Sequence, residues 1–262
     1  MYTFGIDIGS TTSKCAILKD GQQLVASALR VGGIGTQSPA LVVAETLEKA
    51  HLTREDLAFI AATGYGRSRY EGADVQVSEL TCHAQGAHLV FPSVHTIIDI
   101  GGQDAKIIRL NEQGRMENFL MNDKCAAGTG RFLDVMASVL QIPVSEFADY
   151  AARSTAPAAI SSTCTVFAES EVISQLANGV SMPDLVAGIC ASVAGRVASL
   201  AKRLEITPDL CMSGGVAQNG GVRHAMEQAI GQSILFSEKA QLFGAIGAAH
   251  YAWLKCNQGS ES

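Results

Sequence analysis

Apolar positions along this 262-residue chain form short runs that alternate with stretches of helical spacing. In the first 94 residues the runs predict four strands, at 2–8, 14–18, 22–29 and 59–63. The helical spacing predicts two helices, at 39–51 and 78–89. Strands that alternate with helices in this way predict an α/β architecture.

The same order of elements restarts near residue 95. Strand patterns at 95–100 and 105–110 flank a second glycine-containing turn, and a further strand is predicted at 116–121. The order strand, glycine turn, strand, turn, strand therefore occurs twice, although the two copies share little identity. We expect two lobes: residues 1–94 with 243–258 in lobe I, and residues 95–242 in lobe II.

The rest of the chain is mainly helical. Helices are expected at 131–140, 167–177, 183–204, 219–230 and 243–254, and short strands at 209–212 and 234–236. The last helix has Gly or Ala at 244, 245 and 247–249. Side chains this small allow another backbone to approach closely, so we expect tight packing there.

Composition narrows the class of protein. Hydrophobic residues make up 47% of the chain, which is enough for a sizeable core. The net charge of −6 argues against a nucleic-acid binder, whose binding face is usually basic. We find neither a basic start followed by an apolar segment nor an apolar run of about 18 residues, so we expect a cytoplasmic protein without a membrane span.

The turn between the first two strands is the first candidate site. Backbone N–H groups of a glycine-containing turn, together with hydroxyls, form a concave site for phosphate oxygens. A carboxylate at the end of the first strand can hold Mg²⁺, directly or through water, and a lysine can neutralise phosphate charge. The candidate residues are Asp7, Gly9, Ser10, Thr11, Thr12 and Lys14.

The second glycine-containing turn repeats this layout. Its candidate residues are Asp99, again a possible Mg²⁺ ligand, with Gly101, Gly102, Gln103 and Lys106. Gly and Asp also suit ordinary hairpin turns, so one motif alone would be weak evidence for phosphate binding. The pair favours a polyphosphate ligand, although neither motif is a Walker A loop.

A third motif follows the strand expected at 209–212. Two glycines after a strand permit the close approach of a flat ligand, here adenosine. A helix entry capped by an Asn would look the same and is compatible with that role. The candidate residues are Gly214, Gly215, Val216 and Asn219.

These three motifs resemble those of the actin, Hsp70 and sugar-kinase superfamily, which has a two-lobed, ribonuclease H-like ATPase fold. The resemblance implies ATP in a cleft between two lobes, with 78–89 and 243–254 as connecting helices. An acidic or Gln residue near the first of these helices often positions the attacking water in that superfamily. Glu79 occupies the matching place, with Gln103 and Asp104 as alternatives, and an exposed helix-start Glu is an equally good explanation of Glu79.

Two of the seven cysteines have unusual surroundings. Cys125 and Cys164 each precede an amphipathic helix and have small or hydroxyl neighbours. A helix N-terminus favours thiolate and stabilises an anionic cluster. Two thiolates are half of the four that a [4Fe–4S] cluster needs, and a twofold dimer supplies the rest. Two unrelated buried cysteines are an equal alternative. The others are expected to be packing residues: Cys15, Cys82, Cys190, Cys211 and Cys256.

Several segments resemble the 2-hydroxyacyl-CoA dehydratase activators. They are 63–67 (TGYGR), 99–106 (DIGGQDAK), 122–134 (NDKCAAGTGRFLD), 161–171 (SSTCTVFAESE) and 214–219 (GGVAQN). The resemblance extends from residue 2 to about 254, and within the family it is strongest to activators of (R)-2-hydroxyglutaryl-CoA dehydratase. The ATP-binding subunits of benzoyl-CoA reductase belong to the same broader family.

This resemblance implies an oxygen-sensitive ATPase of anaerobic metabolism. Two copies share one [4Fe–4S] cluster through Cys125 and Cys164. The activator receives one electron from a reduced ferredoxin or flavodoxin and passes it to the dehydratase, coupled to the hydrolysis of Mg²⁺-bound ATP to ADP. The dehydratase then removes water from its substrate, here expected to be 2-hydroxyglutaryl-CoA, by radical chemistry. No nucleic acid or membrane partner is implied.

Three alternatives stay open. The first is the ATP-binding subunit of a benzoyl-CoA reductase-type system, which changes the partner and keeps the chemistry. The second is a small-molecule kinase of the same fold, which would leave the two helix-start cysteines unexplained. The third is an ATP-gated binding or scaffold protein without redox chemistry.

Overall fold

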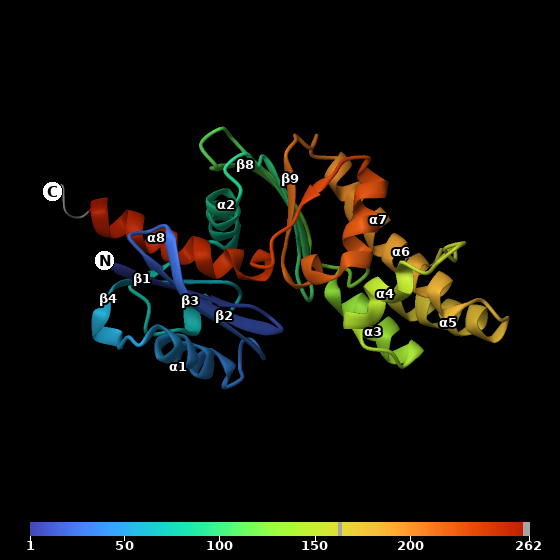
Figure 1. Ribbon diagram of the computed structural model, residues 1–262, viewed down its shortest axis with the longest axis horizontal. Helices are drawn as coiled ribbons and strands as arrows, with labels where there is room; N and C mark the ends of the chain where they lie inside the picture. The colour runs from blue at the N-terminus through green and yellow to red at the C-terminus, as the bar shows by residue number, and fades with distance from the viewer. Residues whose placement is uncertain (162–163, 259–262) are drawn as a thin grey trace. The chain divides into compact units, whose positions relative to one another are not determined.

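The computed structural model describes residues 1–161 and 164–258, and the chain divides into two compact units (Figure 1). Unit 1 comprises Met1–Val94, Leu110–Glu117 and Gln241–Ser262, and unit 2 comprises His95–Arg109 and Asn118–Ala240. Leu110–Glu117 thus belongs to unit 1, whereas the sequence predicts it in lobe II. This turn packs on a helix of unit 1, where a Cβ on Gly114 would meet the ring of His88.

Unit 1 is built on a five-stranded sheet with the order β3-β2-β1-β4-β5. The first three strands form an antiparallel meander, and β4 and β5 join it in parallel. The β2–β3 turn contains Asp20 and Gly21 with φ of 51° and 73°, the left-handed values that a tight hairpin needs. The strands are β1 (Tyr2–Ile8), β2 (Thr12–Lys19), β3 (Gln23–Val31), β4 (Leu57–Thr63) and β5 (Val75–Gln76).

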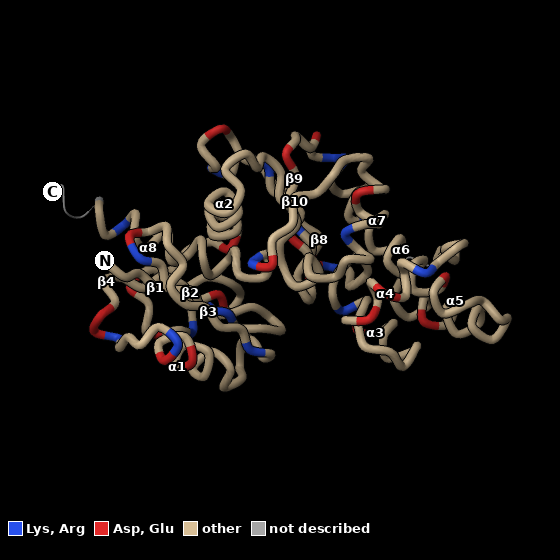
Figure 2. Tube along the Cα trace, viewed as in Figure 1, with Lys and Arg blue, Asp and Glu red and all other residues tan. Residues whose placement is uncertain are grey.

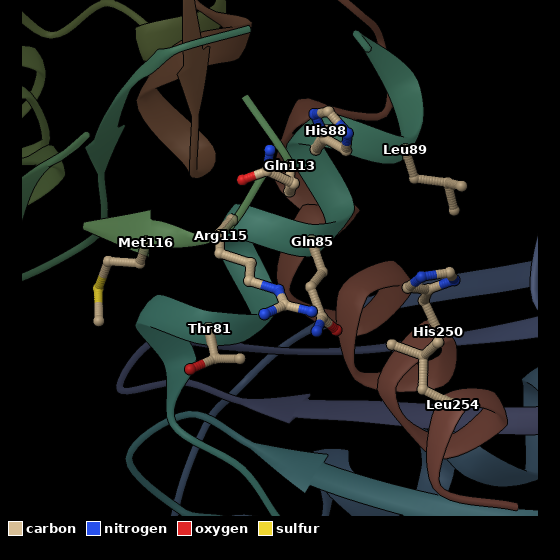
Figure 3. Close-up of a pocket in the computed structure, with 11 residues that line it drawn as sticks. Thr81, Gln85, His88, Leu89, Gln113, Arg115, Met116, His250 and Leu254 are labelled. Atoms are coloured by element: carbon tan, nitrogen blue, oxygen red, sulfur yellow. The ribbon is translucent and has the colours of Figure 1, made fainter. Parts of the chain in front are cut away.

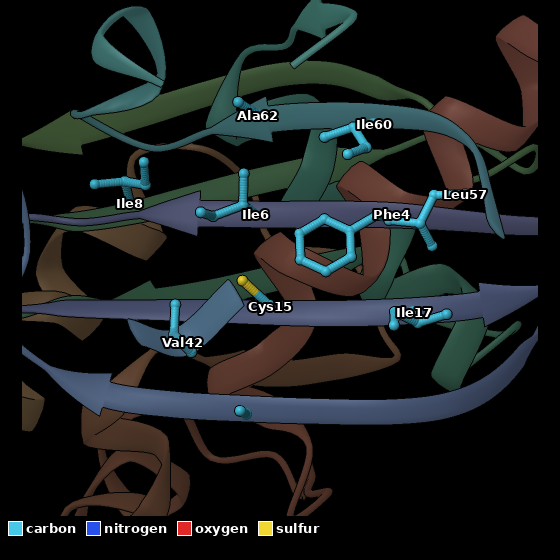
Figure 4. Packing of buried hydrophobic residues seen from close by; sticks show 10 residues of the cluster. Phe4, Ile6, Ile8, Cys15, Ile17, Val42, Leu57, Ile60 and Ala62 are labelled. Carbon is cyan, nitrogen blue, oxygen red and sulfur yellow. The ribbon is translucent and has the colours of Figure 1, made fainter. Parts of the chain in front are cut away.

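Each face of this sheet has its own core. On one face Phe4, Ile6 and Ile17 pack against Val42 of α1 (Ser38–Ala50), as Figures 1 and 4 show. On the other face Leu18 packs against Ile246 of α8 (Phe243–Gln258). The alternation of buried side chains along β1 and β2 therefore supplies both cores, as expected of strands covered on both sides.

The closing helix α8 approaches other backbones as closely as its small residues predict. A Cβ on Gly5 of β1 would collide with the backbone of α8 at Ala245. A Cβ on Gly247 would collide with the backbone at Cys82 in α2 (Glu79–Val90), which packs along α8. The expectation of tight packing is confirmed, because only glycine leaves room at these crossings.

Unit 2 repeats the arrangement of strands. Its sheet has the order β8-β7-β6-β9-β10, in which β6 pairs antiparallel with β7 and parallel with β9, as β1 does with β2 and β4. The sequence-level repeat is therefore a repeat of topology. The strands are β6 (Thr96–Ile100), β7 (Ala105–Leu110), β8 (Met116–Asn122), β9 (Leu210–Ser213) and β10 (Ile234–Leu235).

The described part of unit 2 also contains the helices α3 (Gly130–Leu140), α4 (Phe147–Ala151), α5 (Thr165–Ala177), α6 (Met182–Lys202) and α7 (Gly220–Ile230). Short 3₁₀ turns lie at Arg54–Asp56, Arg67–Arg69, Val144–Glu146, Gly215–Gln218 and Ala240–Leu242. The sequence misses β5 and α4, since two and five residues are too short to show a period.

Helix α6 is the core helix of unit 2. Among the described residues it alone is long and apolar enough to cross a membrane by length and composition, although the sequence contains no uninterrupted apolar run of about 18 residues. However, 56% of its most apolar window is buried within the protein, where it packs against α4 and α7. Figure 2 shows Lys and Arg interspersed with Asp and Glu along each unit.

Candidate functional site

The first phosphate hairpin lies in unit 1 at the turn between β1 and β2. Asp7 and Lys14 face each other across the two strands, and Lys14 Nζ lies 3.1 Å from Asp7 Oδ2. The Asp7 side chain is 7% exposed and the Lys14 side chain 12%. The turn residue Gly9 donates its N–H to the carbonyl of Thr12 at 3.0 Å, and Thr11 is exposed at the tip.

Glycines hold this hairpin in place. Gly64 follows β4 with φ of 84°, and a Cβ there would collide with both the Asp7 carboxylate and the Ile8 carbonyl. A Cβ on Gly244 would lie 2.8 Å from Asp7 Oδ2. Gly33 packs against the carbonyl of Gly9 in the same way. The sequence reasoning gives Gly64 and Gly244 no role at Asp7, because the contacts join β1 to distant segments.

The second phosphate hairpin lies in unit 2 at the turn between β6 and β7. Lys106 Nζ lies 2.7 Å from Asp104 Oδ2 and 3.3 Å from Asp99 Oδ2. The hydroxyl of Ser213, at the end of β9, donates to Asp99 Oδ1 at 2.6 Å. The side chains of Lys106, Asp99 and Asp104 are 4%, 3% and 7% exposed, so the charges are paired in a poorly solvated place.

The start of helix α3 is joined to this second hairpin. Gly130 and Arg131 donate their N–H groups to the carbonyls of Gly101 and Gly102 at 2.9 and 2.8 Å. These are two of the N–H groups that the first turn of a helix leaves without an intrahelical partner. The hairpin and the helix that follows Cys125 are therefore directly linked within unit 2.

The third motif also meets the second hairpin. Gly214, with φ of 82°, follows β9 as Gly64 follows β4, and a Cβ there would collide with the Ile100 carbonyl. Asn219 caps α7, since its Oδ1 accepts from the N–H of Val222 at 3.2 Å. Gly215 and Val216 form the 3₁₀ turn between them. The structure thus places Asp99, Ser213 and Gly214 together in unit 2.

The three candidates for positioning water differ in their surroundings. Asp104 is 5% exposed and its Oδ2 is paired with Lys106. Gln103 is exposed at the tip of the second hairpin. Glu79 is the first residue of α2 and is partly exposed. Of the three, the Asp104 carboxylate is therefore the most deeply buried and lies against Lys106, whereas Gln103 is the most exposed.

The cysteines separate into two classes by exposure. Cys125 and Cys164 are exposed, and Cys164 is the N-cap residue of α5. Cys15, Cys82, Cys190 and Cys211 are buried, whereas Cys256 is partly exposed. Burial raises the pKa of the Cys82 and Cys190 thiols to about 12, which keeps them protonated and poor ligands. Burial also raises the pKa values of Cys15 and Cys211.

The segments around the exposed cysteines are fixed by local hydrogen bonds. Asn122 Nδ2 donates to the carbonyl of Cys125 at 3.1 Å. The Glu171 carboxylate on α5 accepts from the N–H of Ser161 at 3.0 Å, while Ser162 and Thr163 lie outside the described residues. The described residues contain no group of three or more His, Cys, Asp or Glu side chains placed to hold one metal ion. One described chain therefore offers two exposed thiols, not a complete site.

Paired units with equivalent strand order, a candidate phosphate hairpin in each and a glycine turn after β9 have the architecture of an actin-like ATPase fold. A ROK family glucokinase from Streptomyces griseus, solved with glucose and AMPPNP, shares this fold, with a TM-score of 0.60 at 11% identity over 96% of this chain and 99% of its own.

The chain belongs to the BadF/BadG/BcrA/BcrD ATPase family, which it matches over residues 4–252. It is 59% identical to the (R)-2-hydroxyglutaryl-CoA dehydratase activating ATPase of Acidaminococcus fermentans, over 97% of this chain and 98% of that relative. It is 49% identical to the activator of lactoyl-CoA dehydratase of Anaerotignum propionicum, over 97% and 98%. The solved activator of the 2-hydroxyisocaproyl-CoA dehydratase from Clostridium difficile with bound ADPNP superposes with a TM-score of 0.97 at 51% identity, over 100% and 97%.

Proposed function

We propose that this ATPase activates a 2-hydroxyacyl-CoA dehydratase by passing it one electron from a reduced ferredoxin or flavodoxin in the cytoplasm. The names of its relatives support the partner class, since three of them act with hydroxyglutaryl-, lactoyl- or hydroxyisocaproyl-CoA dehydratases. The hydroxyglutaryl relative is the most identical of these three. We therefore propose 2-hydroxyglutaryl-CoA as the substrate of the partner dehydratase.

The exposure of Cys125 and Cys164 carries this proposal. Both thiols are exposed, whereas four of the other five are buried with limited access to a metal. Thiolates of Cys125 and Cys164 from two copies would make up the four ligands of a [4Fe–4S] cluster. Such a cluster, when bound, supplies a one-electron carrier between the donor and the dehydratase.

The surface beside Cys164 supports a homodimer. Val166 and Phe167, in the first turn of α5, are 67% and 68% exposed. Adjacent apolar side chains with this exposure are typical of surfaces that another protein covers. In a twofold dimer the same patch on the second copy would cover them and exclude water from the four thiolates.

The two hairpins and the glycine turn would bind the nucleotide. Asp7 and Asp99 offer the carboxylate oxygens that Mg²⁺ prefers, directly or through water. Lys14 and Lys106 offer ammonium groups for phosphate oxygens, and Ser10, Thr11 and Thr12 add hydroxyl donors. Gly214, Gly215, Val216 and Asn219 would lie against the adenosine. Glu79 or Gln103 would orient the attacking water.

Anaerobic purification tests the proposal. Iron and acid-labile sulfide assays should give about four of each per two chains, with an electron paramagnetic resonance signal after one-electron reduction. Cys125→Ser and Cys164→Ser should each lose this iron and stay folded, because both side chains are exposed. Cys256→Ser is the matched control and should keep it.

Activation of a purified hydroxyglutaryl-CoA dehydratase should then require ATP, a reduced donor and both cysteines. A colourless protein that hydrolyses ATP, or iron content that the Cys125 and Cys164 variants leave unchanged, would contradict the proposal. If the protein activated a benzoyl-CoA reductase and no dehydratase, the proposed partner would be wrong and the electron-transfer role would stand.

A further inference from the structure

The segment that leads to Cys164 contains neither helix nor strand, and side chains of two neighbouring helices hold its described part. We call residues 154–161, which lie between α4 and α5, the approach segment. Most of its residues are exposed. A surface segment without regular structure has few contacts of its own to fix it. Cys164 follows only three residues after Ser161, so the bonds that fix the approach segment also limit where the thiol can lie.

The start of the approach segment is bound to α6. Asp184, in the first turn of α6, accepts through Oδ1 from the hydroxyl of Ser154 at 2.7 Å and from the N–H groups of the next two residues at 3.0 and 2.9 Å. The backbone carbonyl of Asp184 accepts from the N–H of Ala158 at 2.9 Å. A Cβ on Gly188 would collide with the carbonyl of Ala158, so α6 and the segment are in close contact there.

The end of the approach segment is bound to α5. Gln175 Nε2 donates to the carbonyl of Ala159 at 2.8 Å. The N–H of Ser161 donates to Glu171 Oε1 at 3.0 Å and Oε2 at 3.1 Å, and the Ser161 hydroxyl donates to Glu171 Oε1 at 2.9 Å. Glu171 and Gln175 are four residues apart and therefore lie on one face of α5. The approach segment thus runs antiparallel to α5, toward the end of the helix that Cys164 caps.

Glu171 holds the described residue that comes last before the thiol. Along the chain its bonds to Ser161 lie closer to Cys164 than those of Gln175 or Asp184. Hydrogen bonds to a charged carboxylate are stronger than those between neutral groups. Cys164 is also the N-cap residue of α5, on which Glu171 lies. The bonds between Ser161 and Glu171 therefore close a loop of the chain that contains Cys164.

We propose that Glu171 is a positioning residue for the Cys164 thiolate. It acts through Ser161 and not as a ligand, and the inference rests on the iron–sulfur cluster of the proposed function. Groups that orient a metal ligand from outside the ligand set typically change metal affinity 10–100-fold when they are lost. With Ser161 held in place, Cys164 loses less conformational freedom when a cluster binds, so binding is tighter.

Iron release to the chelator bathophenanthroline disulfonate, from the full chain purified anaerobically with its cluster, tests the proposal. Glu171→Leu removes the bonds to Ser161 and should release iron at least about tenfold faster than the unmodified protein. Glu171→Gln should stay within about threefold of the unmodified rate, because its amide oxygen still accepts from the N–H and hydroxyl of Ser161.

Glu169→Leu is the matched control. Glu169 lies on the same helix, two residues nearer to Cys164, and within residues 1–161 and 164–258 its side chain makes no hydrogen bond or ion pair. The control removes the same charge without touching Ser161, so it should release iron at the unmodified rate. The electron paramagnetic resonance signal of the reduced cluster should broaden in Glu171→Leu and not in Glu169→Leu, because a loosely held thiolate gives a spread of cluster geometries.

Hydrogen exchange of the iron-free protein measures the positioning itself. Peptides that cover 157–161 should exchange at least about tenfold faster in Glu171→Leu than in Glu169→Leu. Ser161→Ala removes only an exposed hydroxyl and should release iron about threefold faster, which keeps the proposal testable if Glu171→Leu does not fold.

The results separate this proposal from the proposed function. If the unmodified protein binds iron, and Glu171→Leu and Glu169→Leu release it equally, Glu171 has no positioning role and the proposed function stands. Release from Glu171→Gln as fast as from Glu171→Leu would also overturn the proposal, since charge and not hydrogen bonding would then be responsible. Absence of iron from the unmodified protein would overturn both.

Discussion

The two phosphate hairpins have the same backbone and different electrostatics. In each, an Asp at the end of the first strand faces a Lys on the second, and a positive-φ glycine follows the adjacent parallel strand. In unit 1 Lys14 meets one carboxylate, that of Asp7. In unit 2 Lys106 meets Asp99 and Asp104, and Ser213 donates to Asp99 as well. The repeat therefore conserves the geometry of the turn and changes how strongly the lysine is held.

This difference indicates that Lys106 and Lys14 have different roles. Lys106 is 3% exposed and lies between two carboxylates, so it compensates buried charge first of all. Lys14 pairs with one carboxylate among the described residues and is more exposed, so its ammonium group can turn toward a phosphate at lower cost. The following substitutions test the comparison in order of expected effect.

Removal of the two lysines should have the largest and most unequal effect. Lys106→Met leaves two buried carboxylates uncompensated and should lower the free energy of unfolding by about 3–5 kcal/mol. Lys14→Met leaves one uncompensated carboxylate and should lower the free energy of unfolding clearly less. Urea denaturation without nucleotide measures both. Equal losses of stability in the two variants would show that neither the second carboxylate nor the deeper burial of Lys106 makes its ion pairs more important to the fold.

The two positive-φ glycines should behave alike. A Cβ at Gly64 would meet the Ile8 carbonyl, and one at Gly214 would meet the Ile100 carbonyl. Gly64→Ala and Gly214→Ala should each cost about 2–4 kcal/mol, from backbone strain and the clash together. Gly35→Ala is the control, since Gly35 has φ of 85° and no atom within 4 Å of its added Cβ, and it should lose only the strain component. A large difference between Gly64 and Gly214 would break the equivalence.

The hydroxyls at the ends of β4 and β9 should differ. Ser213→Ala removes a donor from the buried Asp99 carboxylate and should cost about 1.5–3 kcal/mol. Thr63 donates instead to the carbonyl of Val77, so Thr63→Val should cost about 1 kcal/mol or less. Thermal unfolding of the pair measures the difference. If Thr63→Val lowered the stability more than Ser213→Ala does, the stronger hydrogen-bond network would belong to unit 1 and not to unit 2.

The two aspartates should have related effects on hydrolysis if both serve Mg²⁺. Asp7→Asn and Asp99→Asn should each raise the Mg²⁺ concentration for half-maximal ATPase activity by about tenfold, since an amide is a poorer ligand than a carboxylate. Steady-state ATPase assays across a Mg²⁺ series measure this. A variant with an unchanged Mg²⁺ dependence would show that its Asp serves only to pair with its lysine.

Much of the fold follows from local sequence patterns. The strands at 2–8 and 105–110 and the helix near 131–140 occur as predicted, because period-2 and period-3.6 patterns are strong over such lengths. The assignment of Leu110–Glu117 to unit 1 does not follow, since it depends on the packing of Gly114 on His88. Contact between segments 26 residues apart leaves no periodic signal.

The candidate sites divide in the same way. The residue types at Asp7, Lys14, Asp99 and Lys106 predict phosphate hairpins, because Gly, Asp and Lys at these spacings suit a strand–turn–strand unit. The exposed and buried classes of cysteine are only partly predictable, since exposure depends on what packs over each thiol. The pocket of unit 1 that Figure 3 shows has no sequence motif, because α2, α8 and the turn that joins β7 to β8 bring its residues together.

The sequence by itself determined the elements, their repeated order and the residues that can bind phosphate, because these depend on local periodicity and on side-chain chemistry. Only the tertiary structure decided that Ser213 and Gly214 complete the second hairpin, and that Gly64 and Gly244 enclose Asp7. It also left Cys125 and Cys164 exposed and joined Ser161 to Glu171. These features arise from contacts between segments that are distant in the sequence. Local sequence patterns do not show which side chains such contacts bury or bring within bonding distance.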